Sequence, residues 1–313
     1  MASRTPPVFF TLGTRGSALA LAQANEARRL LAEANGWEIE RIELRVIRTS
    51  GDRIQDRPLA EAGGKGLFTK EIDAALLAGE IDAAVHSAKD LPSLLPPSVA
   101  IAATLVREDV RDALVSAFAA TVEGLPLGAT IGAASLRRQA QALRLRPDLK
   151  PALLRGNVET RLKKAEAGEV GATLLALAGL KRLGLERRAR AVLDLDAFLP
   201  APGQGAIAIT ARSADARALS ALAPISDAET AAALLAERAF LAELEGSCRT
   251  PIAGLARLEA GRLRFRGEVL RADGSERFDI AAEGAPADAA RLGREAGREL
   301  ASHLPAGVLF RGE

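Results

Sequence analysis

One short segment of this 313-residue chain puts ionisable side chains directly after an apolar stretch. Residues 81–85 are mostly apolar, and His86, Ser87, Lys89 and Asp90 follow before Pro92. Ligands of open α/β sheets bind beyond the carboxyl ends of the strands, so a titratable cluster at such an end is a candidate site. The alternative is a solvated turn, since an exposed Lys-Asp pair contributes only about 0–1 kcal/mol.

Three expected helix starts combine a capping residue with arginines. Each places guanidinium groups beside the exposed N–H groups of a first helical turn, which is an arrangement that binds anions. Capping residues with ordinary surface arginines are the alternative at any one of them. Three such starts in two parts of the chain, together with Lys65 and Lys89, indicate a polyanionic ligand. The starts contain Arg15 and Ser17, then Ser135, Arg137 and Arg138, then Arg155, Asn157 and Arg161.

The glycine-rich segment 63–66 contains Lys65 but is not a nucleotide-binding P-loop. That motif requires G-x-x-x-x-G-K-[ST], and here Gly66 follows the lysine. A mobile loop over a site and an ordinary tight turn both remain compatible with this segment.

The single cysteine, Cys248, follows an expected helix end at Gly246. The negative end of a helix disfavours a thiolate, so Cys248 is poorly placed for a nucleophile that is regenerated at each turnover. It is either structural or a permanently alkylated anchor. One cysteine and two histidines exclude an internal disulfide and a Cys/His zinc cage, and we expect no metal site.

Composition narrows the choice of partners. The 42 basic and 40 acidic residues nearly balance, and aromatic residues make up 3% of the chain, so neither a basic coat nor stacking surfaces for nucleic acid are expected. The N-terminal residues lack a hydrophobic signal core, and no run approaches the ~20 apolar residues of a membrane span. We therefore expect a cytoplasmic enzyme that contacts neither nucleic acid nor membrane.

The order of the expected elements predicts an α/β fold with two doubly wound lobes of similar plan and a small α+β C-terminal domain. Each lobe is expected to hold a parallel sheet, and the strand at 206–210 could return to the first lobe. The predicted domains are 1–106 with 204–222, then 107–203, then 223–313. Expected strands are 9–14, 42–46, 81–85, 130–133, 151–154, 172–176, 206–210, 263–270 and 277–281, and expected helices are 18–35, 69–77, 136–145, 158–167, 228–245 and 288–302.

Eight sequence blocks, in order over about residues 8–302, closely resemble porphobilinogen deaminase (hydroxymethylbilane synthase). Any one block is weakly specific, whereas eight in register are highly specific. They are RGSALA (15–20), GGKGLF (63–68), VHSAKD (85–90), SLRRQ (135–139), LRGNV (154–158), AGLKRLG (178–184), PGQG (202–205) and GSCRTP (246–251).

The resemblance implies two lobes like those of type II periplasmic binding proteins and a third domain that carries the cysteine. It implies a transferase that joins four porphobilinogen molecules into the linear tetrapyrrole hydroxymethylbilane, acts as a monomer, and holds a covalent dipyrromethane cofactor on Cys248. Asp90 would be the catalytic carboxylate. Ser87, Lys89, Ser135, Arg137 and Arg138 would bind the cofactor, and Arg15, Ser17, Lys65, Phe68, Arg155, Arg161 and Gln204 would bind substrate.

The chain departs from common family patterns at Glu61, Ala133 and Ser247. These departures affect individual contacts rather than the expected activity. The competing interpretation is a non-enzymatic, two-lobed protein that binds polycarboxylates. Such a protein would need neither Cys248 nor Asp90.

Overall fold

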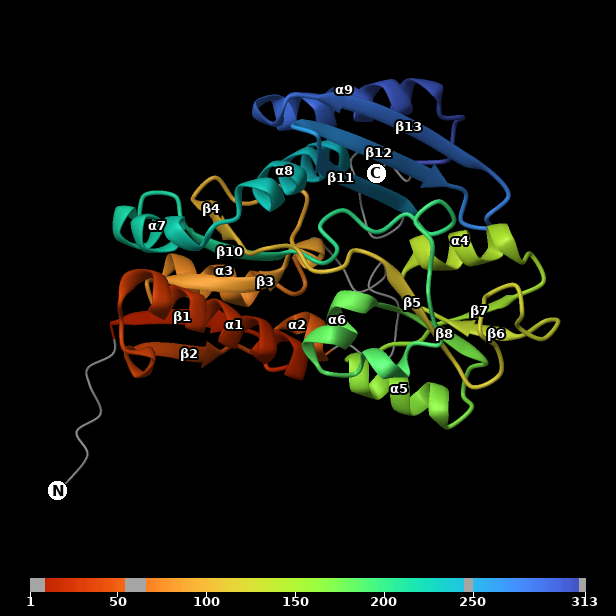
Figure 1. Ribbon diagram of the computed structural model, residues 1–313, viewed down its shortest axis with the longest axis horizontal. Helices are drawn as coiled ribbons and strands as arrows, with labels where there is room; N and C mark the ends of the chain where they lie inside the picture. Colours follow the sequence, from red (N-terminus) through yellow and green to blue (C-terminus); the bar gives the residue numbers. More distant parts are fainter. Residues whose placement is uncertain (1–8, 54–65, 245–249, 310–313) are drawn as a thin grey trace. The chain divides into compact units, whose positions relative to one another are not determined.

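The computed structural model describes residues 9–53, 66–244 and 250–309, whose helices and strands are drawn in Figure 1. These residues form two compact units. The first contains the chain up to residue 53 with residues 66–107 and 206–231, and the second contains residues 108–205 and the chain from residue 232 onward. Within the described part of the chain, no helix is both long enough and apolar enough to cross a membrane.

The first unit is built on a five-stranded mixed sheet with the strand order β2-β1-β3-β10-β4. Strands β1, β2 and β3 are parallel, whereas β10 is antiparallel to both of its neighbours. The elements are β1 (Phe10–Thr14), α1 (Ala18–Asn35), η1 (Ile39–Arg41), β2 (Ile42–Val46), α2 (Ser50–Arg53), α3 (Lys70–Leu77), β3 (Ala83–Ser87), η2 (Ala88–Asp90), β4 (Val99–Thr104), β10 (Ile207–Arg212), α7 (Ala216–Leu222) and η4 (Ala223–Ile225).

Helices cover both faces of this sheet because successive side chains of a strand point to opposite faces. On β3, Ala83 and Val85 lie in one buried core with Leu31 of α1. Ala84 lies in a second core with Leu76 of α3. This is the doubly wound arrangement that the sequence predicts.

The second unit begins with a sheet of the same plan, ordered β7-β6-β8-β5-β9. Its first three strands are parallel and β5 is antiparallel to β8, so both sheets have an antiparallel strand beside three parallel ones. The elements are β5 (Asp112–Ser116), β6 (Thr130–Gly132), α4 (Leu136–Leu145), β7 (Lys150–Ala152), α5 (Val158–Glu166), β8 (Ala172–Ala176), α6 (Leu177–Arg182), η3 (Glu186–Arg188) and β9 (Ala191–Val192).

The faces of this second sheet are also covered on both sides. Leu174 of β8 lies in a core with Ala142 of α4. Its neighbour Leu175 lies in another core with Leu162 of α5 and Leu180 of α6. The sequence prediction of two doubly wound lobes is therefore confirmed.

The C-terminal part is an antiparallel sheet, β11-β12-β13, with helices on one face. Phe240 of α8 packs against Phe265 of β12 with ring centroids 4.8 Å apart, and Leu292 and Leu300 of α9 belong to the same core. Figure 1 shows α9 lying along β12 and β13. The elements are α8 (Ala228–Glu243), β11 (Ile252–Glu259), β12 (Arg262–Leu270), β13 (Arg277–Gly284), η5 (Pro286–Asp288) and α9 (Ala289–His303).

Local helix signals are confirmed by the structure. Ser17 caps α1 by accepting a hydrogen bond from the N–H of Ala20, and Gly36 ends the helix in the left-handed conformation. Asp227 accepts a hydrogen bond from the N–H of Thr230 at the start of α8 (2.8 Å). These signals are reliable because each is contained within a few consecutive residues.

Longer-range features differ from the prediction. The expected all-parallel sheets are mixed, because β10 returns to the first sheet between β3 and β4 in antiparallel orientation. Strand β3 lies two residues later than expected, and β4, β5, β9 and β11 are additional strands. Strands β4 and β5 pair with segments distant in the chain, which a local hydrophobic pattern does not specify, whereas β11 forms a hairpin with β12.

Candidate active site

The charged segment after β3 lies at the carboxyl end of a parallel strand, as predicted. Strand β3 ends at Ser87, and the next three residues form the single turn η2. The N–H of Ala88 donates to the carbonyl of Ala206 (3.0 Å), which attaches this turn to the loop that enters β10. Lys89 and Asp90 are half-buried there. A fixed turn with a partly solvated carboxylate is suited to chemistry on a charged ligand.

His86 does not share this environment. It lies within β3, is buried, and places Nε2 3.1 Å from Oγ1 of Thr210 in β10. Burial, together with the nearby charge of Arg15, lowers the pKa of His86 to about 4. His86 is therefore a neutral core residue at neutral pH, and it does not belong with Lys89 and Asp90 in one titratable cluster.

Arg15 connects the start of α1 to the turn that carries Asp90. Its Nη1 lies 3.8 Å from a carboxylate oxygen of Asp90. Its guanidinium carbon lies 4.1 Å from the centroid of the Phe68 ring, within the range of a cation–π contact. The structure therefore brings together Arg15, Phe68 and Asp90, with Ser17 capping the same helix.

Asp52 is a site residue that the sequence analysis missed. Its carboxylate accepts hydrogen bonds from Nε of Arg15 (3.1 Å), from Nη2 of Arg15, and from the hydroxyl of Thr49 (2.8 Å). Burial alone would raise the pKa of Asp52, but the hydrogen bonds from Arg15 and Thr49 outweigh it and hold the pKa below its ordinary value. Thr49 and Asp52 have the spacing of a capping box, which is the signal that could have identified them.

Ser87 has a partner within the first unit. Its hydroxyl lies 2.9 Å from Nε2 and 3.1 Å from Oε1 of Gln23 on α1. This contact attaches the end of β3 to the first helix. A role for Ser87 toward a cofactor stays a prediction.

The other two predicted helix starts lie in the second unit and have the expected caps. Ser135 accepts from the N–H of Arg138 (3.5 Å) at the start of α4, and Asn157 accepts from the N–H of Thr160 (2.8 Å) at the start of α5. Nε of Arg161 donates to the carbonyl of residue 156 (2.8 Å). Arg155 is buried just before α5. The interpretation of solvated surface arginines therefore does not hold for Arg155.

Arg137 and Arg138 are almost completely buried and share one carboxylate. Nη1 of Arg137 lies 2.8 Å from Asp112 and Nη2 of Arg138 lies 2.7 Å from it, and Asp112 is 0% exposed. Burial alone would raise the pKa of Asp112, but the two guanidiniums hold it below its ordinary value. Asp112 begins β5 and was not identified from the sequence, although an acidic residue at the start of a buried apolar strand is itself a signal of pairing.

Gln204 is fully buried in the same cluster. Its Nε2 donates to the carbonyl of Val110 and to Asp112, both at 2.8 Å, and its Oε1 lies 3.5 Å from Nη2 of Arg138. These contacts fix the loop before β10 to β5. A contact between Gln204 and substrate stays a prediction.

The buried cluster of Arg137, Arg138, Asp112 and Gln204 contains a donor without a hydrogen-bond partner in the described part of the chain. Nε of Arg137 is buried and has no hydrogen-bond partner among the described residues. An orphaned buried donor costs about 1–3 kcal/mol, and two guanidiniums around one carboxylate leave positive charge that a further carboxylate would neutralise. The donor set therefore fits a carboxylate-bearing group such as dipyrromethane. Lys65, Glu61, Ser247 and Cys248 lie outside the described residues.

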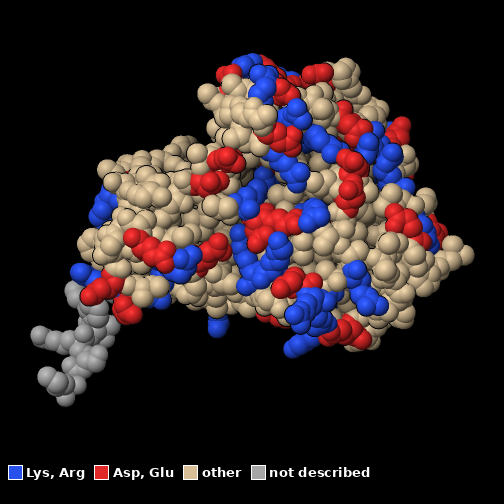
Figure 2. Space-filling view, in the orientation of Figure 1, with Lys and Arg blue, Asp and Glu red and all other residues tan. Residues whose placement is uncertain are grey.

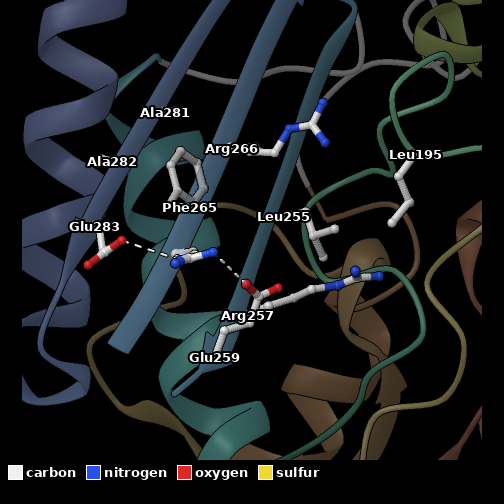
Figure 3. A pocket seen from close by; sticks show the side chains of 10 residues that line it. Leu195, Leu255, Arg257, Glu259, Phe265, Arg266, Ala281, Ala282 and Glu283 are labelled. Carbon is white, nitrogen blue, oxygen red and sulfur yellow. Dashed lines mark hydrogen bonds and ion pairs between the residues drawn. The ribbon is translucent and has the colours of Figure 1, made fainter. Parts of the chain in front are cut away.

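A separate groove of about 410 Å³ lies on the C-terminal sheet (Figure 3). Arg264 lies between Glu259 (3.0 Å) and Glu283 (3.3 Å), and Arg266 pairs with Asp196 (2.6 Å). Figure 2 likewise shows basic and acidic side chains interspersed over the visible surface. Each of these two guanidiniums has at least one carboxylate of its own, whereas Arg137 and Arg138 share one, so the groove is less suited to a polyanion than that pair of arginines.

The fold and these residues define a class, namely two-lobed α/β proteins whose capped helix starts carry arginines. Two family models match the chain: "Porphobilinogen deaminase, dipyromethane cofactor binding domain" over residues 10–220, and "Porphobilinogen deaminase, C-terminal domain" over residues 231–302. The chain belongs to the porphobilinogen deaminase family. It is accordingly a transferase of tetrapyrrole biosynthesis.

Curated relatives are similar in sequence to this chain over nearly its whole length. Porphobilinogen deaminases of Nitrobacter hamburgensis and Nitrobacter winogradskyi are 60% and 58% identical to it over 293 residues, which is 94% of this chain and 93% of each relative. The enzyme of Paracoccus denitrificans is 55% identical over 295 residues, 94% of each chain.

Solved structures with a similar arrangement include a putative methionine-binding lipoprotein of Bacillus subtilis and immunogenic lipoprotein A of Vibrio vulnificus. The first is 16% identical with a TM-score of 0.41, and covers 69% of this chain and 89% of its own. The second is 13% identical with a TM-score of 0.43, and covers 71% and 96%.

Proposed function

We propose that this chain joins four porphobilinogen molecules head to tail with Asp90 as the catalytic carboxylate. The observation that carries this assignment is the placement of Asp90 on the fixed turn after β3, 3.8 Å from the guanidinium of Arg15. A partly solvated carboxylate beside a cation stays available to a positively charged reacting group while an anionic substituent binds close to it.

The proposed role of Asp90 follows from the charge that develops in the substrate. Loss of ammonia from porphobilinogen leaves an electron-poor azafulvenium cation. An ionised carboxylate stabilises such a cation and accepts hydrogen bonds from the pyrrole N–H. Four additions followed by hydrolysis release hydroxymethylbilane.

The proposed role of the arginines follows from the carboxylates of the substrate. Each porphobilinogen adds two carboxylates, so the bound product becomes more anionic with every step. We propose that Arg15, Arg155 and Arg161 bind these groups, together with Ser17, Lys65, Phe68 and Gln204. Guanidinium groups suit this task because their planar fork matches a carboxylate.

The dipyrromethane cofactor is proposed to be bound by Cys248 through a thioether and by Ser87, Lys89, Ser135, Arg137 and Arg138 through polar contacts. When bound, it supplies the free pyrrole carbon to which substrate units are added. The buried, partnerless Nε of Arg137 supports this assignment, because a carboxylate there would satisfy it. We further propose that the chain acts as a cytoplasmic monomer with the domains 1–106 with 204–222, 107–203 and 223–313.

The mass of the purified chain separates this proposal from a non-enzymatic polycarboxylate-binding protein. The proposed enzyme should exceed its sequence mass by two pyrrole units. An unmodified mass with intact binding of a polycarboxylate would favour the binding protein instead.

The role of Asp90 is tested by Asp90→Asn, for which we expect turnover to fall by about two to four orders of magnitude with an unchanged melting temperature. Glu80→Gln is the matched control, since Glu80 also lies 3.8 Å from an arginine, Arg45, in the same unit. The control should retain wild-type turnover. Turnover of Asp90→Asn within about threefold of wild type would remove Asp90 from the mechanism.

A further inference from the structure

We propose that Glu268 of β12, acting through Gln141 of α4, is the positioning residue that holds the guanidinium of Arg137 in place for a bound carboxylate. This inference rests on the proposed function, in which Arg137 binds the cofactor. It goes beyond it, because neither Glu268 nor Gln141 belongs to the sequence blocks that resemble the family. The contacts join the C-terminal sheet to a helix of the second lobe within one compact unit.

The side chain of Gln141 can take only one orientation in this cluster. It lies between the carbonyl of Leu199 (2.9 Å), the carboxylate of Glu268 (2.9 Å) and Nη1 of Arg137 (2.9 Å). The carbonyl and an ionised carboxylate only accept hydrogen bonds, and a guanidinium only donates. The amide nitrogen must therefore face Leu199 and Glu268, which leaves the amide oxygen facing Arg137.

The same chain of contacts determines which donors of Arg137 are occupied. Nη1 donates to Gln141 and to the carbonyl of Leu199, and it lies 2.8 Å from Asp112. Both of its hydrogens are thus engaged in hydrogen bonds, and the contact with Asp112 is an ion pair. The buried Nε lacks a partner among the described residues, so it is a donor that remains for a ligand. Fixing Nη1 fixes the plane of the guanidinium and with it the direction of Nε.

Glu268 is held in place from two sides. It is 3% exposed, and it lies 3.7 Å from Arg277 of the neighbouring strand, which also carries Asp279. Burial raises the pKa of Glu268, while the hydrogen bond from Gln141 and the charges of Arg277 and Arg137 oppose that rise. Glu268 lies on the face of β12 opposite the apolar core residues Phe265 and Val269, and it is buried there although Arg264 and Arg266 on the same face are exposed. A carboxyl group buried at such a cost indicates a specific hydrogen-bonding role.

The turn between β12 and β13 packs closely on α4 and fixes the distance between Glu268 and Gln141. Gly274 has a φ of 74°, and a Cβ at this position would lie 2.5 Å from the backbone N of Arg144 and 2.6 Å from the carbonyl oxygen of Ala140. Only glycine permits this contact between the hairpin and the helix. The helix that carries Arg137 and the strand that carries Glu268 are therefore held in a fixed relation.

The test compares Glu268→Leu, Glu268→Gln and a control, Glu259→Leu, which removes an exposed carboxylate from the same sheet. Each full-length chain is produced in cells that make no porphobilinogen, so that it starts without covalent pyrrole, and is then incubated with limiting porphobilinogen. The rate at which it gains its first two pyrrole units is followed by intact mass. We expect Glu268→Leu to slow this gain by about 3- to 10-fold, as for one lost hydrogen bond. Because the buried amide of Gln141 loses an acceptor, the melting temperature should also fall, and loading is therefore compared at a temperature at which every variant is folded.

Glu268→Gln should restore the wild-type rate, because its amide oxygen can still accept from Gln141. Gln141→Met removes the other partner of the same hydrogen bond, the one on helix α4. It replaces Glu268→Leu in the test if that variant does not fold. The double variant of Gln141→Met and Glu268→Leu should be no slower than either single variant. Wild-type loading in both single variants would overturn the inference. A wild-type chain that gains no pyrrole mass would overturn the proposed function and the inference together.

Discussion

Replacing Asp112 by asparagine would leave two buried guanidinium groups without their shared counter-ion. Asp112 is fully buried, and its carboxylate lies 2.8 Å from Arg137 and 2.7 Å from Arg138. The amide side chain would keep the shape and one acceptor oxygen but lose the charge. We therefore expect the Asp112→Asn variant to fold with a large loss of stability.

The size of this stability loss follows from the burial of Asp112. Removing one partner of a buried ion pair typically costs about 3–5 kcal/mol, because the remaining charge is left uncompensated in a low dielectric. For domains of this size, each 1 kcal/mol lowers the melting temperature by about 2–4 °C, so the variant should melt roughly 6–20 °C below wild type.

Asp148→Asn is the matched control for a thermal melt followed by circular dichroism. Asp148 pairs with Arg146 through two hydrogen bonds of 2.7 Å, but closer to the surface of the same unit. Water screens this pair and solvates the free arginine, so its melting temperature should change far less. Equal shifts in the two variants would refute the argument that burial sets the cost.

The pH dependence of the same variant has a definite sign. Because the folded-state pKa of Asp112 lies below its ordinary value of 3.8, the carboxylate contributes its full stability above that value and loses it as the pH falls below it. The difference in melting temperature between wild type and Asp112→Asn should be constant between about pH 5 and 8 and shrink below about pH 4. A difference that grows on acidification would contradict the assigned charge state.

Three further outcomes are expected. Cys248→Ala should yield a chain without covalent pyrrole that melts at a lower temperature, since a group bound only by the native state stabilises it; pyrrole retained at wild-type stoichiometry would exclude this anchor. Asp52→Asn should raise the KM for porphobilinogen by about 3- to 10-fold with a smaller change in kcat, because Arg15 loses the carboxylate that orients it; an unchanged KM would show that Asp52 does not position Arg15. The folded-state pKa of His86, about 4, lies below its ordinary 6.5, so the unfolded chain protonates first and the free energy of unfolding should fall by up to about 3 kcal/mol as the pH drops from 6.5 to 4. His86→Gln should remove this contribution in urea titrations, and a slope unchanged by the substitution would assign it to other groups.

Much of the local structure could be predicted because its determinants lie close together in the chain. Ser17, Ser135 and Asn157 each cap a helix through a hydrogen bond to an N–H three residues later. Such bonds depend on residue type and spacing alone. The placement of Lys89 and Asp90 just beyond a strand also followed from the local pattern, as did the family, through eight short blocks.

The partners of the charged side chains were set by how distant segments meet. Asp112 precedes Arg138 by 26 residues, and nothing near either residue indicates that β5 and α4 place them 2.7 Å apart. Strand β10 enters the first sheet more than a hundred residues after β3, and it makes His86, a member of the predicted titratable cluster, a buried, neutral partner of Thr210. Spacing along the chain specifies which groups can cap or bind. Burial and the choice of counter-ion depend on which strands become neighbours, and that is decided only when the complete sheets have packed.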